Sequence, residues 1–275
     1  MPMKTLMYML VLNNRLPYRF KYMLSKLSAG SGELDELLES DSAISIVDVT
    51  NEHLLLKNGN RITSLPLGEE KEEVLYSDTI DSITMGPDGI LYAVLFDNSG
   101  KYSVAAIGST TGTVIWETPM SSKVGSPVFG ENGKLFVISS SNELISINQS
   151  TGSVLWSSVL VNQDDSNQIT GSIMGKDKVL YCTLNEGKLI SFDTLTRTVF
   201  WEGALLHKGP SKPVISNQGI LYIGVQDSDT SYLRSLSAMQ TPHSQTTPEY
   251  QPNSTFQLVN GEGDSGNSNF YISRY

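Results

Sequence analysis

Residues 127–156 read PVFGENGKLFVISSSNELISINQSTGSVLW, and this stretch decides the fold. Short apolar segments alternate with Asn-Gly and Thr-Gly turns, a pattern typical of successive antiparallel hairpins. It predicts four strands, at residues 126–129, 134–138, 143–147 and 153–156. Four antiparallel strands in a row form one blade of a β-propeller.

The same pattern occurs twice more, in residues 83–116 and 172–201. The first contains GPDGILYAVL and GSTTGTVIW, and the second contains GKDKVLYCTL and DTLTRTVFW. All three tryptophans of the chain stand at one place in this unit, 40 and 45 residues apart: Trp116, Trp156 and Trp201. A period of this length, made only of short strands, predicts a propeller of antiparallel blades.

Two weaker units flank the clear ones. Residues 213–222 repeat the beginning of a blade and residues 232–238 fit its third strand, but neither a Thr-Gly turn nor a tryptophan follows. Upstream, residues 44–62 indicate strand, strand and turn. The alignment sets Gly59 and Pro66 against Gly112 and Pro119. We expect an all-β propeller of four to six blades within residues 41–240, with degenerate terminal blades. An incomplete ring and a fragment of a longer parent are the alternatives to a small complete ring.

These units resemble the PQQ-like β-propeller repeats, a family seen in quinoprotein dehydrogenases and in the barrel-assembly lipoprotein BamB. The family unit is roughly Ser-Pro-x-x-x-x-x-Gly-x-x-Tyr, then Ala-x-Asp-x-x-Thr-Gly-x-x-x-Trp. By position, the small residue of the family unit corresponds to Ala106, Ser146 and Ser191, and its Asp to Gly108, Asn148 and Asp193. The turn glycine corresponds to Gly112, Gly152 and Arg197. The tryptophan corresponds to Trp116, Trp156 and Trp201. The resemblance implies that each tryptophan docks structurally between neighbouring blades. Arg197 departs from the family pattern and puts the turn geometry of its blade in question.

Residues arranged for catalysis, metal binding or cofactor binding are not evident in this sequence. The quinoprotein enzymes of the family use two adjacent cysteines over the quinone, and one cysteine, Cys182, cannot supply that pair. Cys182 stands in an apolar strand, so we expect a buried core residue rather than a reactive thiol. His53, His207 and His243 lie far apart, with no Cys or carboxylate at ligand spacing. We therefore expect no catalytic residues, no metal site and no cofactor.

The fold alone does not transfer an activity, so function has to be weighed separately. The leading hypothesis is a non-enzymatic scaffold that binds a protein partner through blade-edge loops or one face, as the BamB resemblance implies. The alternative is a propeller enzyme or small-ligand sensor with a site in the central channel. The expected first strands offer few groups for such a site: Ser82, Thr84, Ser126, Ser172, Ser211 and Lys212.

Charge divides the chain unevenly. Residues 1–30 hold five basic residues and no acidic one, whereas the remainder holds 14 basic and 29 acidic residues. Nucleic acid is therefore not an expected partner, because binding to phosphates needs concentrated positive charge.

The two ends are less regular. Residues 1–40 form a basic and then acidic extension, in which the apolar run 6–12 suggests a targeting or membrane-associating segment. An amphipathic helix over residues 18–27 and a docked extension are the alternatives, and residues 33–41 suit a short helix or linker. The compartment stays open, with a secretory or membrane-associated location as one option. Residues 241–275 are a polar tail in which 255–259 and 270–272 suit a closing hairpin.

Overall fold

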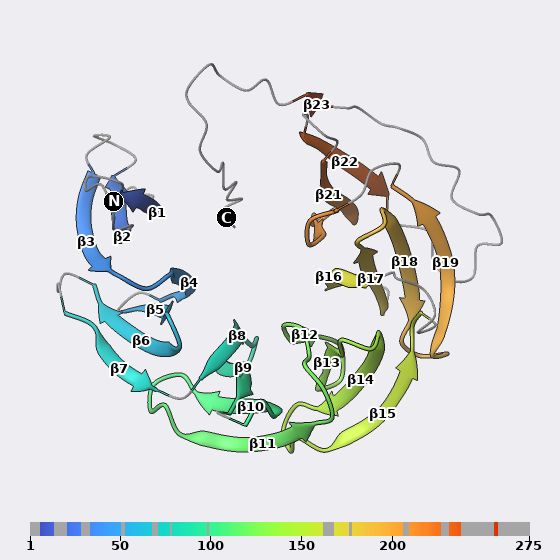
Figure 1. Ribbon diagram of the computed structural model, residues 1–275, viewed down its shortest axis with the longest axis horizontal. Coiled ribbons are helices and arrows are strands. Elements are labelled where there is room, and N and C mark those ends of the chain that lie inside the picture. Colours follow the sequence, from blue (N-terminus) through green and yellow to red (C-terminus); the bar gives the residue numbers. More distant parts are fainter. Residues whose placement is uncertain are drawn as a thin grey trace. The chain divides into compact units, whose positions relative to one another are not determined.

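The computed structural model describes residues 6–13, 21–28, 34–50, 53–67, 71–77, 79–97, 99–161, 168–175, 178–205, 209–226, 231–237 and 256–257. Within these ranges every regular element is a β-strand (Figure 1). The chain divides into two compact units, residues 1–169 and 170–275.

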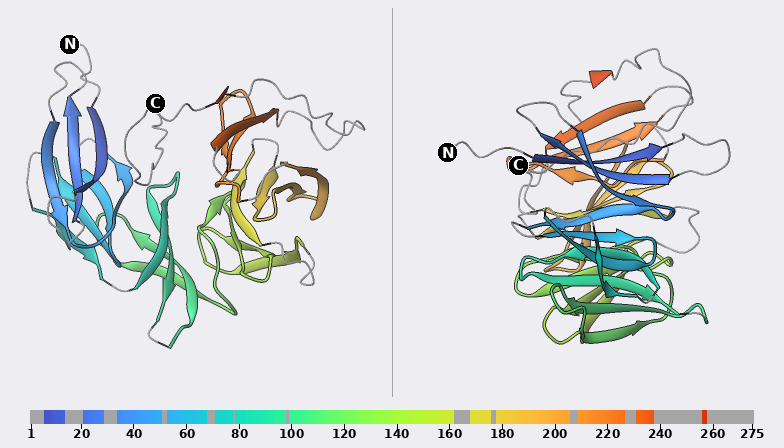
Figure 2. Two further views of the ribbon diagram at one scale, coloured as in Figure 1. Left: turned by 45° about the horizontal axis from the view of Figure 1, so that its top comes forward. Right: turned by 90° about the vertical axis from the view of Figure 1, so that its left-hand side faces the viewer.

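The first unit begins with a three-stranded antiparallel sheet, which we call the N-terminal sheet. Its strands, in spatial order, are β1 (Leu6–Asn13), β2 (Lys21–Ser28) and β3 (Leu34–Ser40). Figure 2 shows it beside the first of three four-stranded sheets. Buried leucines join the two sheets, with Leu24 of β2 packed against Leu54, Leu56 and Leu65.

Each of the three following sheets is a blade whose strands lie in sequence order. Blade 1 contains β4 (Ile44–Val49), β5 (His53–Asn58), β6 (Arg61–Pro66) and β7 (Glu73–Tyr76). Blade 2 contains β8 (Ile80–Met85), β9 (Ile90–Phe96), β10 (Tyr102–Gly108) and β11 (Val114–Met120). Blade 3 contains β12 (Val128–Phe129), β13 (Lys134–Ile138), β14 (Glu143–Asn148) and β15 (Val154–Val159). The four strands predicted within residues 126–156 are confirmed.

The second unit holds two further blades. Blade 4 contains β16 (Ile169–Met174), β17 (Val179–Leu184), β18 (Lys188–Asp193) and β19 (Thr198–Ala204). Blade 5 contains β20 (Val214–Ile215), β21 (Ile220–Gln226), β22 (Ser231–Ser237) and β23 (Phe256–Gln257). The described residues therefore form five four-stranded blades of the β-propeller type, and the predicted fold class is confirmed.

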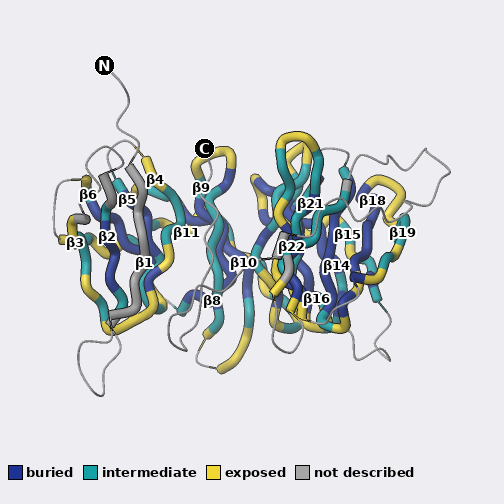
Figure 3. Tube along the Cα trace, turned by 90° about the horizontal axis from the view of Figure 1, so that it is seen from above, coloured by how far each residue is buried: buried dark blue, intermediate teal, exposed yellow. Residues whose placement is uncertain are grey.

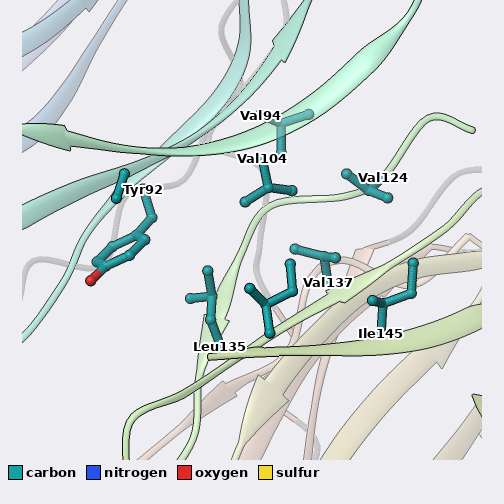
Figure 4. Close-up of a cluster of buried hydrophobic side chains, with 9 residues drawn as sticks. Tyr92, Val94, Val104, Val124, Leu135, Val137 and Ile145 are labelled. Atoms are coloured by element: carbon teal, nitrogen blue, oxygen red, sulfur yellow. The ribbon is translucent and has the colours of Figure 1, made fainter. Parts of the chain in front are cut away.

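The core lies between blades, because the middle strands bury both of their faces. In β9, Tyr92 and Val94 pack toward blade 3, whereas Leu91, Ala93 and Leu95 pack toward blade 1. Successive side chains of a strand point to opposite faces, so two buried faces require a continuous apolar run. Figure 4 shows Tyr92 and Val94 facing Leu135 and Val137. In Figure 3 buried residues lie in the strands and exposed residues gather in the hairpin turns.

Three predictions are wrong in the described residues. Residues 34–40 form strand β3 rather than a short helix or linker, and residues 21–28 form β2 rather than part of an amphipathic helix. The alignment of Gly59 with Gly112 is also wrong, because Gly59 lies in the hairpin between the second and third strands of its blade.

The tail prediction is only partly within the described residues. Residues 256–257 pair with β22 as the fourth strand of blade 5. Residues 241–255 and 258–275, including 270–272, lie outside the described residues.

Candidate functional site: blade junctions and outer strands

Each repeat tryptophan lies directly across from the small residue of its own blade. Trp116 pairs with Ala106, Trp156 with Ser146 and Trp201 with Ser191. The strand register shifts immediately after the small residue in all three blades. Ala106, Ser146 and Ser191 are fully buried. A larger side chain at these positions has no room, which explains the preference for Ala or Ser.

The turn before each tryptophan has the same geometry in blades 2, 3 and 4, although its sequence differs. The residue at the turn-glycine position has a positive φ in each blade: 65° at Gly112, 74° at Gly152 and 62° at Arg197. In each, its N–H donates to the carbonyl four residues earlier, over 2.8–2.9 Å. Arg197 thus adopts the left-handed conformation that glycine normally supplies, at the usual steric cost for a side chain.

The Asp-site residue caps this turn where it has a side chain. Oδ1 of Asn148 accepts hydrogen bonds from the N–H groups of Ser150 and Thr151, both at 3.0 Å. Oδ1 of Asp193 accepts from Leu195 at 2.8 Å and from Thr196 at 3.3 Å. Such bonds satisfy backbone donors that the turn leaves unpaired.

Trp116 joins blade 2 to blade 3. Its indole N–H donates to the carbonyl of Gln149 at 2.9 Å, in the turn that follows β14. A Cβ atom added to Gly152 would lie 2.6 Å from Cε3 of the indole, so the ring rests directly on that glycine. The Thr118 hydroxyl donates to the Gly152 carbonyl at 2.6 Å. The blade 3 turn is therefore held by hydrogen bonds from two residues of β11.

A polar network missed by sequence reasoning surrounds this contact. The Tyr92 hydroxyl donates to Oδ2 of Asp88 at 2.7 Å, and the Gln149 amide donates to the same oxygen at 2.9 Å. Tyr92 is fully buried, and its ring centroid lies 5.9 Å from that of Trp116. Burial and, second, the hydrogen bond to Asp88 raise the pKa of Tyr92. The tyrosine position of the family repeat could have pointed to Tyr92. Gln149 lies 57 residues from Tyr92 in the chain, and no sequence pattern marks it as a partner of Tyr92.

Removing the Tyr92 hydroxyl should show its place in this network. Tyr92→Phe is expected to lower the free energy of unfolding at pH 7 by about 0.5–1.5 kcal/mol. The pKa of Tyr92 is higher in the folded than in the unfolded chain. The contribution of the phenol to the free energy of unfolding is therefore fully present below the unfolded pKa of about 10, and it is lost as the pH rises above that value. Urea unfolding between pH 7 and 11 should therefore show a flatter profile for Tyr92→Phe than for the wild type. Tyr102→Phe serves as control, and identical profiles for all three proteins would contradict the network.

Blade 1 has no tryptophan at the equivalent place, where Tyr76 pairs with Ile62 directly before the register shift, as Trp116 pairs with Ala106. A Cβ atom added to Gly112 would overlap the Leu75 carbonyl group. The turn of blade 2 therefore packs directly on the backbone of blade 1, without an indole between them.

The other two tryptophans pack against aromatic rings of their own blades. The ring centroids of Trp156 and Phe136 lie 5.7 Å apart, and those of Trp201 and Tyr181 lie 6.3 Å apart. In the second unit, Trp201 also lines a small cavity of about 130 Å³ with Leu189, Ile223 and Leu236. The docking role of these tryptophans in stability stays a prediction.

The candidate chemical groups are placed as follows. Cys182 is fully buried in β17, as predicted, and burial raises the pKa of its thiol. His53 begins β5, whereas His207 and His243 lie outside the described residues. No group of three or more His, Cys, Asp or Glu side chains suited to a metal ion occurs among the described residues. In the same part of the chain, no helix has the length and apolarity needed to span a membrane.

The outer strands of the first unit expose apolar side chains. On β11, Val114 and Ile115 are exposed, and on β15 Val154 and Leu155 are exposed, in each case directly before the tryptophan. Ile115 and Leu155 have 52% and 46% of their surfaces accessible. Among the described residues, β11 pairs only with β10 and β15 only with β14, so each leaves one strand edge open.

The repeat geometry agrees with the comparison to known families. A sequence model of the family described as outer membrane protein assembly factor BamB matches residues 50–238. The chain belongs to this BamB family. Its PQQ-like repeats account for the tryptophan, small residue and turn found in blades 2, 3 and 4 of this BamB-family protein.

Solved structures show similarity at the level of the fold. The WD40 domain of coronin from Toxoplasma gondii is 14% identical, with a TM-score of 0.61, 82% of this chain covered and 64% of that one. The designed protein Ika8 is 12% identical, with a TM-score of 0.58 and coverage of 83% and 70%. The calcium-binding protein regucalcin from Agrobacterium tumefaciens is 12% identical, with a TM-score of 0.53 and coverage of 76% and 79%. No curated protein matches this BamB-family sequence.

Proposed function

We propose that this chain is a non-enzymatic scaffold that binds another protein along the outer strands of its blades. The observation that carries the proposal is the pair of apolar residues exposed on each of β11 and β15, beside an open strand edge. Exposed apolar side chains and unpaired backbone groups are the features that favour strand addition and protein docking. The family's description as an assembly factor also supports a role in contacts between proteins.

The exposed side chains of the outer strands are free to serve as a docking surface because they lie outside the core, whereas Trp116 and Met120 of β11 pack against it. The interior of blades 2 and 3 is formed by β9, β10, β13 and β14, together with Val124. Figure 1 shows β11 and β15 on the outer side of the first unit. A substitution at Ile115 or Leu155 therefore changes the surface with little effect on packing.

The test is capture of partners from an extract of the source organism, with the full chain as bait. We expect Ile115→Lys/Leu155→Lys to reduce recovery of the wild-type partner at least about tenfold, because lysine on an edge strand opposes pairing and apolar contact. Val49→Lys/Leu195→Lys is the matched control, since Val49 and Leu195 are equally exposed but lie off the outer strands. All three proteins should keep the same thermal midpoint. Equal recovery by the two double variants, or no saturable partner for the wild type, would contradict the proposal.

A further inference from the structure

One position of the third strand carries a charged residue in blade 5 and an apolar residue in blades 2, 3 and 4. In blade 5 the small residue is Ser235, because it pairs with the aromatic Tyr222 as the small residues of blades 2, 3 and 4 pair with an aromatic residue. The residues directly before the small residues of those three blades are apolar and buried: Ala105, Ile145 and Ile190. Blade 5 has Arg234 at this position, where it pairs with the buried Ile223.

This position faces the preceding blade. Ala105 of blade 2 packs with Ile62 of blade 1, and Ile145 of blade 3 packs with Val104 of blade 2. Arg234 accordingly lies on the face of blade 5 that is turned toward blade 4. The junction of blades 4 and 5 therefore contains a basic side chain where the other junctions contain apolar ones.

A second difference lies two residues after the tryptophan. Blade 2 has Thr118 there, and its hydroxyl donates to the Gly152 carbonyl of the next blade at 2.6 Å. Blade 3 has Ser158, whereas blade 4 has Gly203. Blade 4 thus lacks a side chain at a place where blade 2 contacts its neighbour.

Both positions line the cavity of about 130 Å³ in the second unit. Its walls are mostly apolar and are formed by Leu189, Trp201, Leu205, Ile223 and Leu236. Arg234 belongs to the same lining, and its Nε atom is buried. Glu202 also contributes to the lining, but its side chain alternates to the face of β19 opposite to that of Trp201 and Gly203.

The size and the charge of the cavity together select a ligand. An apolar cavity of about 150 Å³ holds one benzene molecule, so this cavity has room for about one aromatic ring or branched alkyl group. A guanidinium group binds a carboxylate through two parallel hydrogen bonds. Apolar walls with a few polar groups that fix orientation are the usual composition of a small-molecule site.

We propose that the cavity between blades 4 and 5 binds a small monocarboxylic acid that carries one aromatic or branched alkyl group. The apolar group lies between Trp201 and Ile223, and the carboxylate accepts hydrogen bonds from the guanidinium of Arg234. This site does not depend on the scaffold function, because β11 and β15 belong to the first unit and the cavity to the second. It also differs from a site in the central channel, since none of its described lining residues belongs to a first strand.

The first experiment follows the three indole N–H signals of the full chain by NMR while phenylacetate is added. We expect a saturable shift of the Trp201 signal and unchanged signals of Trp116 and Trp156, with Trp201→Phe used for assignment. Phenylacetamide has the ring without the charge and should bind at least about tenfold more weakly, and acetate, which has no ring, should not bind. No saturable shift of the Trp201 signal, or equal affinity for phenylacetate and phenylacetamide, overturns the proposal.

Arg234→Met tests the basic group, because it keeps a long side chain and removes the charge. It should weaken phenylacetate binding at least about tenfold. Its thermal midpoint should not fall, since the other blades have apolar residues at this position. Arg61→Met makes the same charge change at an exposed arginine of the first unit and should bind as the wild type does. Equal weakening in both variants means that only net charge matters and contradicts the site.

Gly203→Thr tests the cavity while Arg234 stays in place. It gives blade 4 the residue that blade 2 has at this position, and the new side chain enters the cavity. The added Cβ would lie 3.3 Å from Cζ3 of Trp201, a contact that a small shift of the ring relieves. Phenylacetate should raise the thermal midpoint of the wild type but not that of Gly203→Thr. Undiminished binding by this variant would place the ligand elsewhere and overturn the proposal.

Two further ligands test the size limit and the source of the acid. 1-Naphthylacetate has a second ring and should bind at least about tenfold more weakly than phenylacetate, because the cavity has room for about one ring. Equal affinity for the two acids contradicts binding inside the cavity. Acetyl-Gly-Gly-Phe offers the same ring and a free carboxylate at the end of a chain. Tighter binding of this peptide than of phenylacetate overturns the assignment to a small free acid.

Discussion

Trp116→Ala is expected to lower the free energy of unfolding by about 3–5 kcal/mol, the usual cost of removing a large packed aromatic side chain. The indole covers Gly152, donates to the Gln149 carbonyl at 2.9 Å and lies against Tyr92. Alanine leaves a cavity at the junction of blades 2 and 3 and a carbonyl without its donor. Urea unfolding followed by circular dichroism measures the change.

Two further variants divide this loss into its parts. Trp116→Phe keeps a ring over Gly152 but removes the N–H donor, so it should cost about 0.5–1.5 kcal/mol plus a smaller packing term. Val114→Ala, on the same strand but exposed, should change stability by no more than about 0.5 kcal/mol. A Trp116→Ala protein as stable as Val114→Ala would show that the tryptophan does not hold the blades together.

The blades were predictable because their signals are local. Asn132 and Gly133 have φ values of 57° and 66°, which is the hairpin geometry that the Glu-Asn-Gly sequence predicted. Apolar runs such as ILYAVLF in β9 predicted strands. The repeat extended these local signals to three blades. The turn at Arg197 has the same positive φ as the turns at Gly112 and Gly152, so the rest of the motif is enough to hold a residue other than glycine in the left-handed conformation.

The errors came from places where tertiary packing decides the structure. The stretch LDELLES has a composition that suits a helix, but as β3 it pairs with β2 and packs Leu37 and Leu38 against blade 1. The weak alignment of Gly59 followed from the lack of a tryptophan in blade 1, which removed the landmark that fixed the other blades. Propensity is a weak guide when such contacts override it.

The junction network was beyond sequence reasoning for a related reason. Asp88 and Gln149 are 61 residues apart and each sits in a turn, where polar residues are ordinary. Their contact depends on how blade 2 packs on blade 3, which no local pattern encodes. The tryptophan was identified because it recurs at one position of the repeat. The carbonyl that it contacts belongs to the backbone, so no residue type in the sequence indicates the contact.

Gly112→Ala is expected to destabilise the first unit by about 2–5 kcal/mol, through two separate effects. The residue has a φ of 65°, and a side chain in this conformation costs about 1–2 kcal/mol. The new Cβ would also overlap the Leu75 carbonyl of blade 1, which is backbone and cannot turn aside. Relieving that overlap requires the two blades to move apart, at a cost typical of overpacking, about 1–3 kcal/mol.

Gly89→Ala separates the two effects, because Gly89 has a φ of 75° and an added Cβ meets nothing within 4 Å. It should lose only the conformational part, about 1–2 kcal/mol. The difference between the two variants in urea unfolding therefore measures the close contact between blades 1 and 2. Since blade 1 has Tyr76 at the register position of the tryptophan, a large difference means that direct backbone packing at Leu75 holds this junction without an indole. Equal losses for Gly112→Ala and Gly89→Ala would mean that the blades adjust freely and that the contact contributes nothing to holding them together.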